Sequence, residues 1–394
     1  MALPLSYHWR NLLVRKTTTL LTVLVIATVV AVFTWMAGFA AALNRSLSVA
    51  AERHKLVVLK RGATSESNSA IPIEDFARLN QLAQVVRDPR TNEPLISPEM
   101  MVQVSLPRIR DGGRTFGNVA VRGVNKTAFA VHTNVALEGE SFSEAEPQVI
   151  VGRAAAEQFA GLRIGDSVSL GFGNDRKFRV VGYFSADGGP VESEIWGYLP
   201  ALMNAYNRSM YSSAWVRLAP GADPAEVIER IKGPAIQLEA ATEADYWLAQ
   251  SQAIRRYLFV AYVLVTVMAL AAVFSIANTM FALVAGRTRE VATLRTIGYS
   301  GRQILYGFVV ESVFLSLLGG VTGCLGCVAW LRLVGGTKDM FGATTFTTMA
   351  FKIDFTPGTA LAALLLVTAV GMVGAVVPAL RASRIAVVTA LREP

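Results

Sequence analysis

Few side chains in this 394-residue chain have the types and spacing that chemistry needs. Cys324 and Cys327 form a C-x-x-C pair, a pattern used for metal binding and for thiol redox chemistry. They are the two cysteines of the sequence, and no histidine lies near them in the sequence to complete a site. We therefore interpret the pair as small residues packed between helices, and we expect residues 44–257 to fold without disulfides.

Familiar catalytic and nucleotide-binding motifs are missing from the sequence. No G-x-x-x-x-G-K-[ST] loop is present, Gly298–Gly301 does not make a hydrolase G-x-S-x-G, and Gly171–Gly173 lacks the third glycine of a dinucleotide loop. The three histidines, His8, His54 and His132, are expected on two sides of a membrane and cannot form one metal site. We expect a chain that is not an enzyme and that holds no metal and no cofactor of its own.

Four long apolar runs define the organisation of the chain. The hydrophobic content is 53% and the mean hydropathy is +0.42, values typical of a polytopic membrane protein. Each run is long enough for the helix of about 20 residues that crosses a bilayer. The first run exceeds the apolar core of about 7–15 residues in a secretory signal, so we expect it to be retained. The predicted membrane helices are 17–43, 258–285, 304–330 and 358–378.

Glu311 is the one acidic residue well inside these runs. An ionisable group within a membrane helix is a functional candidate by default. A structural pairing with a basic residue would explain it equally well. In the same run, Gly319 and Gly323 form a small-x-x-x-small pair that allows close approach of another helix.

Basic residues gather in three short segments beside the apolar runs. The net charge of +8 comes from residues 1–16, 286–303 and 381–394, while residues 44–256 have as many acidic as basic side chains. Because cytoplasmic loops collect Lys and Arg, this pattern places all three segments and both termini in the cytoplasm. The pattern fits a lipid bilayer as the partner, and we expect no nucleic acid. The other assignments are a cytoplasmic amphipathic segment at 1–16, an outer loop at 331–357 and a cytoplasmic tail at 379–394.

Residues 44–257 have the composition of a soluble domain with both helices and strands. Ile73–Val86 predicts a helix, and in Asp223–Gly233 an N-cap aspartate, a first-turn proline and a final glycine predict another. A last helix, Glu243–Tyr257, is expected to run directly into the second membrane helix. Short β-branched runs predict strands at 56–59, 101–106, 149–151, 167–170, 177–183 and 213–218.

The polar segment between the second and third apolar runs also has a helical pattern. Val291, Leu294 and Gly298 recur at about one helical turn, which predicts an amphipathic helix at the membrane face. Gly298 can end that helix, and Ser300 with Gln303 forms an S-x-x-Q capping box for the next one. An ordinary connecting loop would fit these features as well.

The sequence from Arg289 to Gly298, R-E-V-A-T-L-R-T-I-G, resembles the R-E-(I/V)-A-x-L-R-x-(I/L)-G signature of FtsX-like permeases, the MacB, LolC and DevC type of ABC transporter membrane subunit. Pro378–Arg384 and Ala390–Arg392 resemble the P-x-x-R-A-S-R and A-L-R of the family's C-terminus. Val387 departs from the family, which often has proline there, so the last segment can continue as an amphipathic helix. The order of segments matches along essentially the whole chain.

The resemblance implies a fold and a site. Residues 44–257 resemble a MacB-like periplasmic core domain, with a porter-like α/β part and a small β-rich insertion at about 140–205. Segment 286–303 is similar to the coupling helix that docks on a partner ATPase. The implied coupling residues are Arg287, Arg289, Glu290, Val291, Leu294, Arg295 and Gly298.

The resemblance also implies partners and a function. We expect a separate ABC ATPase subunit that binds the ATP, a second copy of this chain, and a periplasmic adaptor of the membrane-fusion type, all at a bacterial inner membrane. The permease would pass ATPase-driven motion to its periplasmic domain and drive export or extraction of a substrate that has already crossed the membrane. Alternatives are an FtsX-like regulator of a cell-wall hydrolase and lipoprotein extraction of the LolC type.

The expected topology can be tested by thiol labelling. In a cysteine-free variant, single cysteines at Ser65 and Ser209 should react with an impermeant thiol reagent added outside intact cells, and one at Ser300 should not. The reason is the charge pattern, which places 44–257 outside and 286–303 inside. Labelling at Ser300 without labelling at Ser65 would invert the topology.

Overall fold

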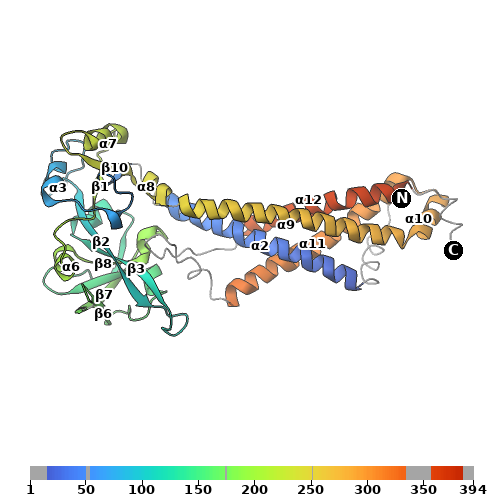
Figure 1. Ribbon diagram of the computed structural model, residues 1–394, viewed down its shortest axis with the longest axis horizontal. Helices are drawn as coiled ribbons and strands as arrows, with labels where there is room; N and C mark the ends of the chain where they lie inside the picture. Colours follow the sequence, from blue (N-terminus) through green and yellow to red (C-terminus); the bar gives the residue numbers. More distant parts are fainter. Residues whose placement is uncertain (1–15, 50–53, 174, 251, 334–355, 385–394) are drawn as a thin grey trace. The chain divides into compact units, whose positions relative to one another are not determined.

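The structure, a computed structural model, describes residues 16–49, 54–173, 175–250, 252–333 and 356–384. The chain divides into two compact units (Figure 1). We call 1–41, 254–334 and 353–394 the helical unit, and 42–253 with 335–352 the globular unit. The amphipathic segment expected at 1–16, most of the outer loop expected at 331–357 and the end of the tail expected at 379–394 lie outside the described residues.

Four long helices contain the apolar runs: α2 (Lys16–Val49), α9 (Gln252–Ala285), α11 (Gly301–Leu333) and α12 (Pro357–Ser383). Each has a stretch long and apolar enough to cross a membrane, and the third and fourth helices extend beyond the ranges expected from hydropathy. The apolar stretches are Thr19–Ala42, Leu258–Ala285, Gly301–Leu333 and Pro357–Ser383.

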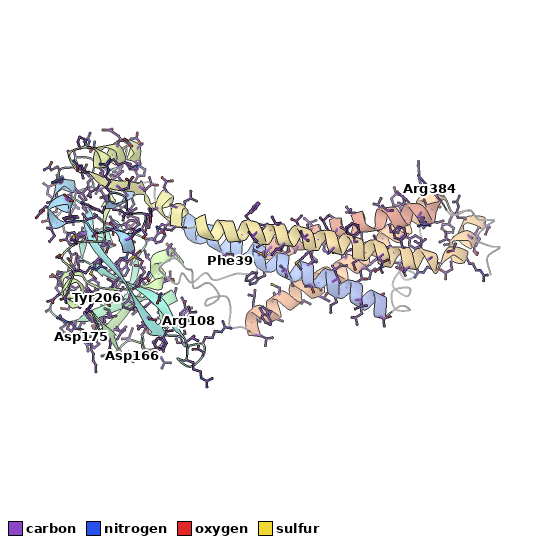
Figure 2. The ribbon with its side chains drawn as sticks, viewed as in Figure 1. Phe39, Arg108, Asp166, Asp175, Tyr206 and Arg384 are labelled. Carbon is purple, nitrogen blue, oxygen red and sulfur yellow. The ribbon has the colours of Figure 1, made fainter. Side chains whose placement is uncertain are left out.

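The helices of the helical unit share one apolar core. Short polar groups add to the packing, since the Thr22 and Thr279 hydroxyl oxygens are 2.7 Å apart between α2 and α9. Within α2, Phe39, which is labelled in Figure 2, stacks on Trp35 with ring centroids 6.4 Å apart. Every long helix contributes to the core, through residues that include Ile26, Ile276, Leu315 and Val367.

Helix α12 continues past Pro378, although the fourth membrane helix was expected to end at residue 378. The helix runs to Ser383 with Pro378 buried inside it. A proline removes one backbone donor, so only one helical hydrogen bond is lost directly. Ala379 and Ala382 are fully buried in one cluster with Phe308 of α11, and this packing holds the last turns in place. The predicted end of the helix at residue 378 was therefore wrong.

The globular unit is built on one mixed sheet of ten strands. The strand order is β10-β1-β9-β2-β3-β8-β5-β7-β4, with β6 paired to β7. The β3–β8 and β5–β7 pairs are parallel and the other pairs are antiparallel. The strands are β1 (Lys55–Lys60), β2 (Ile96–Pro107), β3 (Phe116–Val124), β4 (Ala136–Gly139), β5 (Gln148–Gly152), β6 (Ser167–Leu170), β7 (Arg176–Ser185), β8 (Glu194–Tyr198), β9 (Ser213–Arg217) and β10 (Leu238–Thr242).

Short helices cover this sheet. The helix predicted at Asp223–Gly233 is confirmed, because the Asp223 carboxylate accepts from the Ala225 backbone N–H at 3.0 Å and Gly233 is the C-cap. The chain combines a globular unit of helices and strands with four membrane helices, which confirms the predicted fold class. The helical elements are η1 (Glu66–Asn68), α3 (Ile73–Leu79), α4 (Thr127–Val131), α5 (Arg153–Ala156), η2 (Pro190–Ser193), α6 (Leu199–Ala205), α7 (Pro224–Lys232) and α8 (Glu243–Gln250).

The helix predicted at Ile73–Val86 is too long, because α3 ends at Leu79. The chain then turns, and the backbone of Val85 bridges to Leu218 beyond the end of β9. Leu82 and Val85 are buried in the core between α3 and the sheet, so tertiary packing overrides the helical pattern at this point. The sequence also failed to predict the short strands β4 and β8 and the longer β3.

Two further expectations concern the insertion and the last helix of residues 44–257. The strands of the insertion expected at 140–205 belong to the same sheet as the rest of the unit, since β8 pairs with β3 and β7 pairs with β4. The helix expected at 243–257 appears as α8 and the start of α9, and residue 251 between them is not described. Ser65 is only 8% exposed, so Ser209, which is exposed, is the better outer labelling position.

Candidate functional site

The polar segment between α9 and α11 folds as a short helix, α10 (Thr288–Thr296) (Figure 1). Gly298 follows it with a φ of +105°, a left-handed backbone conformation that favours glycine. The predicted capping box is present: the Ser300 backbone N–H donates to Gln303 Oε1 at 2.8 Å, and the Gln303 backbone N–H donates to Ser300 Oγ at 3.4 Å. The segment is therefore a helix, a glycine stop and a capped start, rather than an irregular loop.

One face of α10 packs on the helical unit. Val291 and Ala292 are buried, and Leu294 is half-buried. Val291 lies in an apolar cluster with Ile304 and Phe308 of α11 and with Ala379 and Ala382 of α12. This face therefore seats α10 on both neighbouring helices.

Two arginines fix α10 by polar contacts. Arg287 Nη1 lies 3.1 Å from Glu311 Oε2, and the side chains are 13% and 2% exposed, respectively. Arg295 Nη1 donates to the backbone carbonyl of Ser383 at 2.8 Å. The first contact joins the start of α10 to α11, and the second joins its last turn to the end of α12.

The opposite face of α10 is open. Arg289, Glu290, Thr293 and Thr296 are exposed, and the Ile297 side chain beyond the last turn is 71% exposed. This face combines charged, hydroxyl and apolar groups, which is suited to contact with another protein. Among the residues predicted for coupling, Arg287, Val291 and Arg295 thus anchor the helix, whereas Arg289 and Glu290 are presented outward.

Gly319 and Gly323 lie where α11 packs against α2. A Cβ atom at Gly319 would come within 2.5 Å of Ile26, and one at Gly323 would come within 2.5 Å of the backbone oxygen of Ala27. Any larger residue would push the helices apart. The two glycines therefore allow close packing of α11 on α2.

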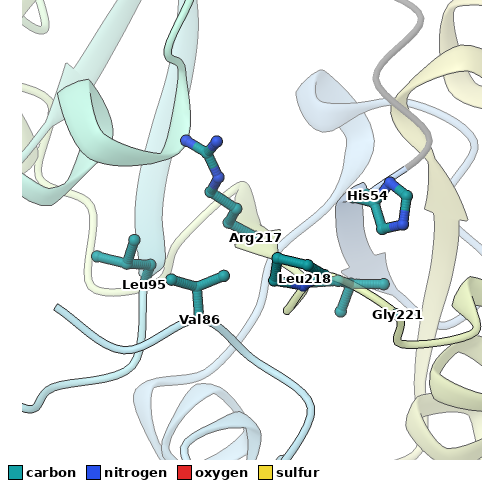
Figure 3. A pocket seen from close by; sticks show the side chains of 7 residues that line it. His54, Val86, Leu95, Arg217, Leu218 and Gly221 are labelled. Carbon is teal, nitrogen blue, oxygen red and sulfur yellow. The ribbon is translucent and has the colours of Figure 1, made fainter. Parts of the chain in front are cut away.

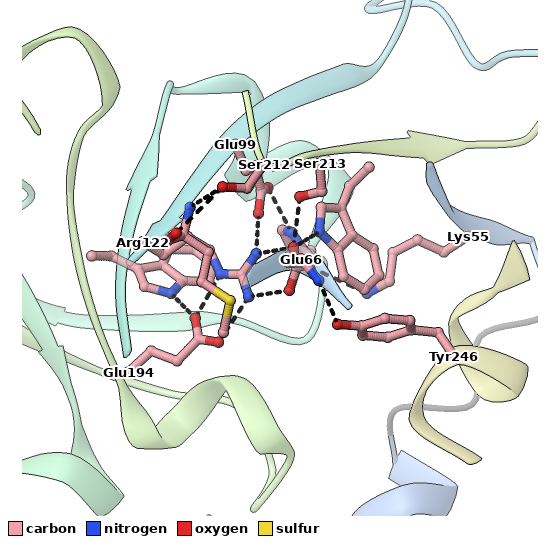
Figure 4. Close-up of polar contacts among 12 residues, drawn as sticks. Lys55, Glu66, Glu99, Arg122, Glu194, Ser212, Ser213 and Tyr246 are labelled. Carbon is pink, nitrogen blue, oxygen red and sulfur yellow. Dashed lines mark hydrogen bonds and ion pairs between the residues drawn. The ribbon is translucent and has the colours of Figure 1, made fainter. Parts of the chain in front are cut away.

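A buried ionic cluster in the globular unit was not foreseen from the sequence. Arg122 of β3 is fully buried and makes five hydrogen bonds to three carboxylates (Figure 4). Its Nε and Nη2 donate to Glu194, both Nη atoms donate to Glu66, and Nη1 donates to Glu99, at 2.6–2.8 Å. Since a guanidinium has five N–H groups, every donor of Arg122 is engaged.

Indole and hydroxyl groups complete the carboxylate contacts. Ser213 Oγ and Trp215 Nε1 donate to Glu66, and Trp196 Nε1 donates to Glu194. Burial disfavours the charged form of Arg122. The three carboxylates outweigh this effect, with the largest contribution from Glu194, and raise the pKa of Arg122 well above its ordinary value. Because Arg122 and its three carboxylate partners are buried, a substrate cannot reach them, and we interpret the cluster as part of the folded core. The available signal was a single arginine within the apolar run Val119–Val124.

The globular unit also has an open pocket with a volume of about 630 Å³ (Figure 3). Its lining is largely apolar, from Val86, Leu95, Leu218 and Pro220, with His54 and Arg217 as basic groups. Arg217 Nη1 donates to the Ala130 carbonyl at 3.0 Å, so part of its hydrogen-bonding capacity serves the fold. Within the described ranges, no group of three or more His, Cys, Asp or Glu side chains is placed to hold a metal ion.

Comparison with curated proteins finds relatives that are longer than this chain. A pyoverdine export ATP-binding/permease protein PvdT of Pseudomonas syringae pv. tomato is 26% identical over 399 residues, which covers 91% of this chain and 58% of the relative. A macrolide export ATP-binding/permease protein MacB of Pasteurella multocida is 34% identical over 116 residues, or 29% of this chain and 16% of the relative. The chain thus spans less than two thirds of the length of these relatives.

Among solved structures, the periplasmic region of MacB from Actinobacillus actinomycetemcomitans aligns with 52% of this chain and 95% of its own, at 14% identity and a TM-score of 0.37. Two family models together match most of the sequence. The MacB-like periplasmic core domain matches residues 17–233, which is more than half of the chain, and the FtsX-like permease C-terminal model matches residues 262–387. The chain therefore belongs to the MacB-like and FtsX-like family of ABC transporter permeases, and it is a multi-pass membrane protein.

Proposed function

We propose that this permease receives force from an ABC ATPase at α10 and passes it through the membrane helices to the globular unit. The globular unit would then act on a substrate that has already crossed the membrane, for export or extraction. The observation that carries this proposal is the double anchoring of α10, by Arg287 to α11 and by Arg295 to α12. A protein that moved α10 from its open face would also have to move both of these helices.

Three polar contacts of the membrane helices favour force transmission over a polar substrate path. Glu311 is engaged by Arg287, and the Thr22 and Thr279 hydroxyls contact each other. Ser312 Oγ donates to the backbone carbonyl of Gly371 at 2.8 Å. A path for a charged substrate needs polar groups that are free to face it, because charges in a bilayer are costly. These side chains instead join one helix to another.

The names of the relatives support one of the proposed partners. Several relatives are named ATP-binding/permease proteins, which supports an ABC ATPase as the protein that contacts α10. We further propose a second copy of this chain in the complex and an adaptor of the membrane-fusion type beside the globular unit. In this arrangement the globular unit is periplasmic and α10 is cytoplasmic.

The Arg287–Glu311 anchor can be tested by unfolding the solubilised protein. Arg287→Ala should lower its stability by about 3 kcal/mol, because the Glu311 carboxylate stays buried without the guanidinium. Adding Glu311→Gln should recover part of the loss, because the buried charge is then removed. Arg289→Ala, at an exposed position on the same helix, is the matched control and should change stability by no more than about 0.5 kcal/mol. Equal losses in the two arginine variants would rule the anchor out.

The ATPase contact can be tested at Ile297. Ile297→Asp should abolish stimulation of the ATPase by the permease, because it places a charge on the apolar part of the open face. Its unfolding transition should stay close to that of the wild type, since the side chain is 71% exposed. The measurement is ATP hydrolysis by the reconstituted complex.

Ile297→Val serves as the matched control, because it keeps an apolar β-branched side chain, and it should retain most of the stimulation. A correctly folded Ile297→Asp variant that stimulated the ATPase fully would refute the contact. Loss of stimulation in both variants would show that the introduced charge is not the cause of the loss.

A further inference from the structure

The cluster around Arg122 extends to a second buried ion pair, between Lys55 and Glu243. Lys55 Nζ lies 2.8 Å from Glu243 Oε2, and the two side chains are 2% and 4% exposed. Lys55 is the first residue of β1, the strand that follows α2 in the chain. Glu243 is the first residue of α8, the helix that precedes α9. The pair therefore joins the two places where the chain enters and leaves the globular unit.

Helix α8 is held on the sheet around this pair. Tyr246 and Trp247 are buried, and the Tyr246 hydroxyl accepts from the backbone N–H of Glu66 at 3.3 Å (Figure 4). The Tyr246 ring packs edge-on against Trp215, with centroids 6.2 Å apart. These apolar contacts and the ion pair lie on the same side of α8, so the helix is held by groups that also belong to the Arg122 cluster.

His132 connects the ion pair to the Arg122 cluster. Its Nδ1 lies 3.4 Å from Lys55 Nζ, and its Nε2 lies 2.9 Å from Glu99 Oε1. An ammonium group can only donate, so Nδ1 accepts from Lys55 and Nε2–H donates to Glu99, which makes the imidazole neutral. A proton added to His132 must go to Nδ1, where it would face the ammonium of Lys55.

We propose that the Lys55–Glu243 ion pair is a latch that holds α8 on the sheet, and that protonation of His132 on acidification releases it. A cationic imidazole in contact with Lys55 repels the ammonium and weakens its contact with Glu243. The charged groups that face His132 are Lys55 from β1, Glu99 from β2 and Arg122 from β3, with Glu243 of α8 behind Lys55. Only the use of the latch in transport rests on the proposed function.

The direction of the pH effect follows from burial. Burial lowers the pKa of His132 below its ordinary value, Glu99 opposes this shift, and Lys55 and Arg122 add to it. The folded state with neutral His132 is therefore fully favoured above the ordinary histidine pKa of about 6.5. That contribution is lost as the pH falls through the lower pKa of the folded state. The latch should thus be closed at pH 7.5, and its contact with the sheet should weaken as the pH falls below the ordinary histidine pKa.

The latch can be tested by hydrogen–deuterium exchange of the full-length solubilised protein without any ATPase. After correction for intrinsic exchange, opening of Glu243–Gln250 should increase at least about tenfold between pH 7.5 and pH 5 in the wild type. The Phe116–Val124 segment of β3 is the internal reference and should stay protected. The proposal would be overturned if α8 were equally protected at both pH values, or if β3 lost protection together with α8. This comparison uses the wild-type protein alone, so it does not depend on whether a variant folds.

Three variants test which side chains cause the pH-dependent hydrogen exchange of α8. His132→Gln can still donate to Glu99 and accept from Lys55 but cannot titrate, so α8 should stay protected at both pH values. Glu243→Gln should leave α8 open at both. Asp75→Asn removes the partner of Lys60 in the more exposed ion pair on the same strand and should behave as the wild type. The latch would be refuted if α8 of His132→Gln still exchanged faster at pH 5 than at pH 7.5, or if α8 of Glu243→Gln stayed protected. These results do not depend on the ATPase contact, so a failure of that contact would leave them unchanged.

Discussion

The pairing of Glu311 with Arg287 is the interaction on which the proposed coupling mechanism depends. A carboxylate in an apolar helix is costly unless a cation reaches it, and Arg287 does so from the start of α10. The position of α10 on α11 is therefore set by charge as well as by the apolar contact of Val291. Because Arg295 makes a separate contact with Ser383 of α12, α10 cannot shift without disturbing two membrane helices.

The globular unit is organised around a comparable constraint. Arg122 draws together carboxylates from η1, β2 and β8, which are far apart in the sequence. Buried ion pairs add little net stability because the charges lose their hydration, but an unpaired member is very costly. The cluster therefore favours one arrangement of these strands over others. Its extension through His132 to Lys55 and Glu243 places α8 under the same constraint.

Local sequence signals predicted the local structure well. The Asp223 cap and the capping box at Ser300 are contacts between residues two or three positions apart, so the sequence pattern contains them. Glu311 stood out as the one acidic residue in an apolar run, although its partner could not be chosen from spacing alone. The long membrane helices were predictable for a similar reason, since hydropathy is a property of a continuous segment.

The failures arose where distant segments meet. The Ile73–Val86 pattern gave no sign that the backbone of Val85 pairs near Leu218, and the buried Ala379 keeps α12 helical beyond Pro378. No periodicity reports the convergence of three glutamates on Arg122, because those contacts link residues 23 to 72 positions apart.

The most direct test of coupling is the hydrogen exchange of α8 in the assembled complex at pH 7.5, with and without a non-hydrolysable ATP analogue. If motion passes from α10 to the globular unit, nucleotide binding will change the exchange of Glu243–Gln250 in the wild type. In Ile297→Asp at the same nucleotide occupancy, exchange of this segment should not change. An equal change in both proteins, or none in the wild type, would contradict transmission through α10.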